Sequence, residues 1–117
     1  MRKIIGITAL TLKRLQNYQQ VVDRELKNAN KLQWTEMTLD QRQEYEAACK
    51  KADRIDAAVG YASFLFRVQN GLAPARILYS EREQVLRNDL VDLLTELLIP
   101  VVMMEIAEEK PETANSG

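Results

Sequence analysis

Four aspartates are the residues of this chain whose type and spacing could do chemistry. Asp53 and Asp56 stand three residues apart in DRIDAAV, and Asp89 and Asp92 do so in RNDLVDLL. Residues three apart lie on the same face of an α-helix, so each pair could act as a pincer. Two such pairs on facing helices would supply the oxygen ligands that Mg²⁺ or Mn²⁺ prefers. The bound ion could then orient a phosphate and activate water.

Helical periodicity favours a simpler role for the same acids. Asp89, Asp92 and Glu96 lie close together on the side opposite the leucines, which is the solvated face of an ordinary amphipathic helix. Asp53 falls outside the apolar seam of its own helix, and Asp56 only flanks that seam. We therefore prefer a solvated face, and a metal site made of these four aspartates is the alternative.

The aspartate motifs also resemble those of the all-α nucleoside triphosphate pyrophosphohydrolases of the MazG type. DLVDLL (89–94) is similar to the second acidic motif of that family, with Asp in place of Glu, and DRIDAAV (53–59) is a looser counterpart of the first. The resemblance implies that acids on neighbouring helices hold magnesium against the phosphates of a nucleotide. Magnesium would then be the cofactor and Asp53, Asp56, Asp89 and Asp92 its ligands.

Composition excludes most other chemistry. The 117 residues are enough for one domain and include no histidine, which rules out Ser-His-Asp and Cys-His catalysis and histidine-based zinc sites. Cys49 is the single cysteine, so no internal disulfide forms, and a reducing, cytoplasmic compartment fits. We therefore expect no enzyme and no cofactor.

Charge and hydropathy limit the classes of binding partner that the chain is expected to have. Sixteen basic and seventeen acidic residues are interspersed along the chain, whereas nucleic-acid binding needs a concentrated positive field. The apolar run 97–104 is far too short to span a bilayer. Neither nucleic acid nor membrane insertion is expected.

The segments that carry the aspartates and the apolar residues are predicted to be helices. Apolar residues at three- and four-residue steps predict a first helix from Thr8 to about Leu32. Thr38 and Gln41 match a capping box that opens a long helix, about 39–69, and Asn70-Gly71 is a natural end for it.

The last third of the chain predicts another helix. Ser80 and Glu83 match a second capping box, and the helix runs to about Ile99, where Pro100 kinks or breaks it. A short helical segment through Glu108 follows. Residues 3–7, KIIGI, are taken as helical rather than as a strand, because a single strand would need a second copy of the chain to pair with.

The predicted fold is all-α: a bundle of three to four mostly antiparallel helices in one domain, 1–109, with a flexible tail at 110–117. The apolar arc of the last helix is wider than one neighbouring helix covers, so we expect a homodimer or larger homo-oligomer. The predicted function is non-enzymatic protein–protein binding, with a macromolecular protein partner, as in regulators, adaptors and phage or plasmid accessory proteins. The candidate partner-binding residues lie on the long and the last helix: Tyr45, Ile55, Val59, Phe66, Leu90, Leu94, Leu97 and Val101.

Overall fold

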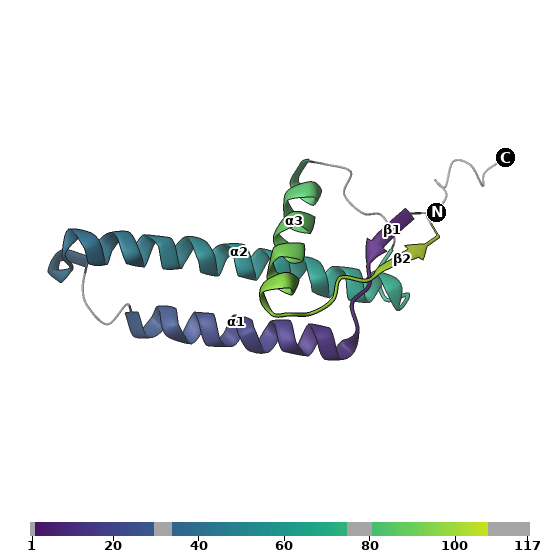
Figure 1. Ribbon diagram of the computed structural model, residues 1–117, viewed down its shortest axis with the longest axis horizontal. Coiled ribbons are helices and arrows are strands. Elements are labelled where there is room, and N and C mark those ends of the chain that lie inside the picture. Colours follow the sequence, from purple (N-terminus) through teal and green to yellow (C-terminus); the bar gives the residue numbers. More distant parts are fainter. Residues whose placement is uncertain (1, 30–33, 75–80, 108–117) are drawn as a thin grey trace.

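The computed structural model describes residues 2–29, 34–74 and 81–107. This part of the chain is mostly helical, which confirms the predicted class, with a small two-stranded sheet in addition (Figure 1). The predicted tail at 110–117 and the predicted cap Ser80 lie outside the described residues. The elements in chain order are β1 (Arg2–Ile5), α1 (Ala9–Ala29), the 3₁₀ turn η1 (Trp34–Glu36), α2 (Leu39–Gln69), α3 (Glu81–Glu96) and β2 (Met103–Ile106).

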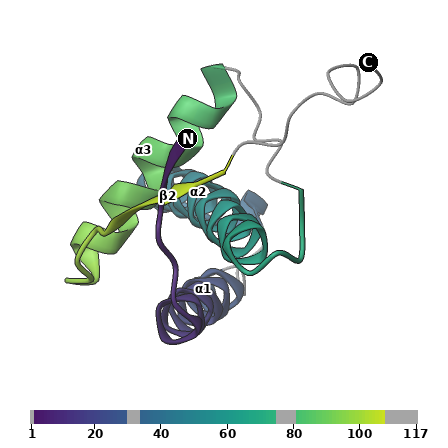
Figure 2. The ribbon, with the colours of Figure 1, turned by 90° about the vertical axis from the view of Figure 1, so that its right-hand side faces the viewer.

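Helix α2 is the central element. It lies between α1 and α3 and contacts both (Figure 2). Helices α1 and α2 run antiparallel as a long hairpin, as predicted, whereas α3 crosses α2 steeply instead of lying alongside it (Figure 1). No helix among the described residues is long and apolar enough to cross a membrane.

The limits of α2 follow from local sequence signals. The Thr38 hydroxyl accepts a bond from the Gln41 amide, and the Gln41 side chain accepts one from the Thr38 amide, which confirms the predicted capping box. At the other end Gly71 adopts φ 72°, and the Leu72 amide bonds the Arg67 carbonyl. This is a Schellman motif with glycine in its left-handed position.

The end of α3 differs from the prediction. The helix stops at Glu96, four residues before Pro100, so the proline follows the helix and does not kink it. The cause is a second Schellman motif, in which the Ile99 amide bonds the Leu94 carbonyl and Leu98 takes the left-handed position with φ 58°.

The first and the last described elements are strands, and here the helical prediction was wrong at two places. Residues 2–5 form β1, and the segment after Pro100 forms β2 in place of a short helix. The two strands pair antiparallel within one chain, with Lys3 opposite Glu105 and Ile4 opposite Met104. A second copy is therefore not needed for β1 to pair. The pairing joins opposite ends of the sequence, and no local signal reveals such a contact.

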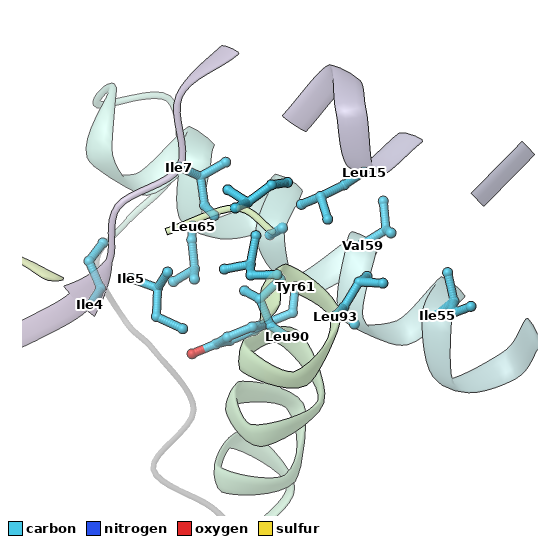
Figure 3. Packing of buried hydrophobic residues seen from close by; sticks show 14 of the residues in the cluster. Ile4, Ile5, Ile7, Leu15, Ile55, Val59, Tyr61, Leu65, Leu90 and Leu93 are labelled. Carbon is cyan, nitrogen blue, oxygen red and sulfur yellow. The ribbon is translucent and has the colours of Figure 1, made fainter. Parts of the chain in front are cut away.

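One hydrophobic core joins all of these elements. Side chains from β1, α1, α2 and α3 converge where α3 crosses α2 (Figure 3). Part of the predicted apolar arc, Leu90, Leu93 and Leu94, is thus covered within the same chain. The most deeply buried large side chains are Ile4, Ile5, Ile7, Leu15, Leu65, Leu90 and Leu94.

Candidate functional site

The two aspartate pairs do not form one cluster. Asp56 accepts a hydrogen bond of 2.9 Å from the Gln19 amide of α1, whereas Asp89 and Asp92 line a cleft on the α3 side of α2. Asp53 is exposed. Within residues 2–29, 34–74 and 81–107, no group of three or more acids or cysteines is placed to hold a metal ion. The structure thus brings Asp89 and Asp92 together, but not with Asp53 and Asp56.

The cleft beside Asp89 and Asp92 has both signs of charge. It encloses about 220 Å³ between α2 and α3, with Lys51 and Arg54 on the α2 side and Glu96 joining the two aspartates on the α3 side. A magnesium ion held between these helices would need anions on both. The cleft instead sets cations against anions, an arrangement that favours contact between the two helices.

Most of the predicted partner-binding residues are used within the chain. Packing places apolar side chains of α2 and α3 against one another and against β1, which leaves them no surface for a partner in this conformation. Phe66 and Leu97 are half-buried against the same core, and only Tyr45 and Val101 lie away from it. The fully enclosed ones are Ile55, Val59, Leu90 and Leu94.

Tyr45 lies at an apolar groove near the far end of the α1–α2 hairpin. The groove encloses about 360 Å³, and its charged rim includes Glu25, Glu44 and Lys51. The Tyr45 ring meets Trp34 edge to face, with centroids 6.3 Å apart. A hydrogen bond with the Cys49 side chain raises the pKa of the Tyr45 hydroxyl above its ordinary value. The apolar lining consists of Val22, Leu26, Ala29, Met37, Tyr45 and Ala48.

A second apolar feature, the β2 surface, comprises Leu98, Val101, Val102 and Met103. Leu98 is 88% exposed, Val102 60% and Met103 46%, although all are large apolar residues close together in sequence. Large exposed apolar patches on a protein mark interaction sites more often than isolated residues do. Of these four, only Val101 was among the candidate partner-binding residues, although Leu98 and Val102 belonged with it to the apolar arc predicted for the last helix.

The first turn of α1 borders the β2 surface. The Arg14 guanidinium donates a 3.1 Å hydrogen bond to the Leu97 carbonyl. Leu10, one turn earlier on the same side of α1, is itself exposed. The Arg14 bond thus ties α1 to the end of α3, next to the β2 surface.

A buried ionic cluster ties β1 to α3. The Glu83 carboxylate is nearly fully buried, pairs with Arg2 of β1, and lies 3.9 Å from the Arg87 guanidinium. The Tyr61 hydroxyl of α2 donates to the same carboxylate at 3.4 Å. Burial, followed by the Glu83 charge, raises the pKa of Tyr61. Glu83 was predicted only as part of a capping box, since no local pattern indicates a partner 81 residues away in sequence.

Gln69 makes a second anchor that the sequence did not reveal. Its side-chain oxygen accepts a 2.9 Å bond from the Ile7 amide, and its side-chain nitrogen donates to the Ile7 carbonyl. The carboxamide therefore replaces a neighbouring strand for this buried residue.

No protein-family model matches the chain, and no curated protein or solved structure is significantly similar to it. The resemblance to MazG-type enzymes thus rests on the aspartate motifs alone.

Proposed function

We propose that this protein is a non-enzymatic binding protein that self-associates and contacts a macromolecular protein partner. The observation that carries the proposal is the β2 surface. Its four large apolar residues lie within a stretch of six and are all exposed, which places four of the ten exposed large apolar residues of the described chain in one short segment. Covering such side chains on association removes them from water, at about 25 cal/mol per Å² of apolar area.

The groove between α1 and α2 supports a second binding role. An apolar trough with a charged rim is the usual acceptor for the apolar face of a partner helix. Tyr45, which lines it, carries an apolar ring and a hydroxyl, a combination enriched at protein interfaces. The groove and the β2 surface lie toward opposite ends of the α1–α2 hairpin, so both can be occupied at once.

Self-association is tested by light scattering at micromolar concentration. The wild-type protein is expected to approach twice its monomer mass of 13.4 kDa as concentration rises. The double variant Leu98→Lys, Val102→Lys should stay at the monomer mass, because it places charges within the apolar surface. The control Leu39→Lys removes a leucine that is 70% exposed at the start of α2 and should behave as wild type. A wild-type protein that remains monomeric contradicts the proposal.

Partner binding is tested separately by affinity capture from the native host. A protein retained by wild type and by the Leu98→Lys, Val102→Lys variant, but lost with Tyr45→Lys, assigns the partner to the groove. Equal capture by all three rejects the groove as its site.

A further inference from the structure

We infer that strand β2 pairs antiparallel with β2 of a second copy, which makes a four-stranded sheet across the dimer. The inference rests on the proposed self-association and specifies how it occurs. Two observations support it. The hydrogen bonds between β1 and β2 identify which backbone groups of β2 point outward, and side chains of the helices cover the outer edge of β1 but not that of β2.

The phase is fixed by one bond at the end of the ladder. The Gly6 amide donates to the Val102 carbonyl at 2.7 Å, and Gly6 continues the register of the paired strands. In an antiparallel ladder, residues that exchange bonds alternate with residues whose backbone groups point outward. The amides and carbonyls of Val101, Met103 and Glu105 therefore point away from β1.

The outer edge of β1 is covered by side chains of the helices. Ile7 is satisfied at both backbone groups by Gln69 of α2. The Lys3 carbonyl accepts from the Arg87 guanidinium of α3 at 3.5 Å, and the Lys3 side chain is exposed at the same edge. Lysine and side-chain cover are the devices by which proteins prevent unwanted strand pairing.

The outer edge of β2 has no such cover. Across the ranges 2–29, 34–74 and 81–107, no side chain or backbone group bonds the outward amides and carbonyls of Val101, Met103 and Glu105. Exposed apolar side chains of the β2 surface flank this edge. An open, apolar edge is a template for another strand.

The edge is complementary to itself. With a two-fold axis at Met103, this residue faces Met103 of the second copy, and Val101 faces Glu105. Every outward amide then meets an outward carbonyl. Shifting the axis to Glu105 would place two carboxylates opposite each other, which is destabilising. The Met103 register therefore satisfies the most backbone groups without a like-charge pair.

Met103→Pro tests the pairing directly. Proline removes the outward amide of residue 103 and leaves the bonds between β1 and β2 intact, and it is tolerated at such an edge position. Sedimentation equilibrium should show a dissociation constant of the dimer that is higher by a factor of at least about ten, since two inter-chain hydrogen bonds are lost per dimer. Circular dichroism should show wild-type helix content, and Leu39→Lys should leave the dimer unchanged.

A charge exchange tests the register and does not depend on proline. Val101→Glu should weaken the dimer about tenfold, because each Glu then faces Glu105 of the other copy. Adding Glu105→Lys, together with Lys3→Glu so that the pair across β1 and β2 keeps opposite charges, should restore the affinity, whereas a merely hydrophobic contact would be weakened by these changes.

The outcomes separate the two proposals. A dimer lost in Met103→Pro and recovered in the charge exchange supports strand pairing. A wild-type dimer that persists in Met103→Pro, with no rescue by Glu105→Lys and Lys3→Glu, overturns strand pairing but leaves self-association standing. A monomeric wild-type protein overturns both.

Discussion

Leu98 and Gly71 occupy the same left-handed position in two Schellman motifs, at the ends of α3 and α2. Glycine adopts φ near +60° without cost, whereas a residue with a Cβ loses about 1–2 kcal/mol there. Leu98 gains nothing in return from packing within the chain, because its side chain is almost fully exposed. A large apolar residue held in a costly conformation at the surface is consistent with a role in binding.

Substitutions of Leu98 should separate the cost of its left-handed backbone conformation from the contribution of its side chain to binding. Leu98→Gly is expected to raise the free energy of unfolding of the monomer by about 1 kcal/mol, because the left-handed strain is relieved. Urea denaturation at low protein concentration measures the change.

The matched control is Leu98→Ala, which removes the apolar side chain but keeps the Cβ and hence the strain. Its unfolding free energy should stay within about 0.5 kcal/mol of wild type. Equal stability of the glycine and alanine variants would show that φ 58° carries no cost here.

Glu83 shows a second effect at the scale of one residue. Its carboxylate, buried among Arg2, Arg87 and Tyr61, compensates charges that would otherwise be enclosed alone. Glu83→Gln is expected to lower the free energy of unfolding by about 3 kcal/mol, since removing one member of a buried pair leaves the other without its counter-charge.

Thermal unfolding, compared with Glu105→Gln, checks this expectation. Glu105 faces Lys3 across the sheet, but both side chains are exposed, so its loss should cost less than about 1 kcal/mol. Similar losses in the two variants would mean that the Glu83 cluster is in effect solvated.

At the scale of the elements, the predictable parts are those encoded by neighbouring residues. The start of α2 is set by Thr38 and Gln41 and its end by Gly71, and each signal lies within a few residues of the boundary. The end of α3 was predicted too late in the sequence because the left-handed position that ends the helix is occupied by Leu98 and not by the usual glycine. The strands were missed because each is a short apolar run whose partner lies a hundred residues away.

The candidate site follows the same division. The helical wheel placed Asp53 outside the apolar seam and left convergence of the two pairs open, and the structure places Asp56 against Gln19 and Asp89 and Asp92 at the cleft between α2 and α3. The helical wheel also placed Leu98, Val101 and Val102 of the β2 surface on the apolar arc of a continuing helix, whereas α3 ends at Glu96 and these residues follow it. The position at which α3 ends determines which of these apolar residues are buried in the core and which are exposed at the surface.

The junction of β1 with α2 gives a prediction at this scale. Gln69→Leu should destabilise the fold by about 3 kcal/mol, because two backbone groups of the buried Ile7 lose their partners. Chemical denaturation measures the loss.

Gln19→Leu serves as the comparison, since Gln19 also bonds another helix through its carboxamide but at an exposed position. It should cost less than about 1 kcal/mol. If both leucine variants were equally stable, water would be satisfying Ile7 and the anchor would have no energetic role.

At the scale of the whole molecule, the first described strand, β1, pairs with the last, β2. Strand β1 is held by α2 through Gln69 and by α3 through Glu83 and Arg87, and β2 is added at its other edge (Figure 1). The sheet is thereby tied to both α2 and α3, while among the described residues nothing pairs with the outer edge of β2. The proposed self-association depends on what fills that edge.

Cross-linking at residue 103 is the most direct test. In a Cys49→Ala background, Met103→Cys treated with a short bismaleimide should yield a covalent dimer in high proportion, because the two-fold axis places the two Cβ atoms about 5 Å apart. Leu39→Cys in the same background, at the opposite end of α2, should yield none. A dimer that cross-links no better through residue 103 than through residue 39 would contradict self-association through β2.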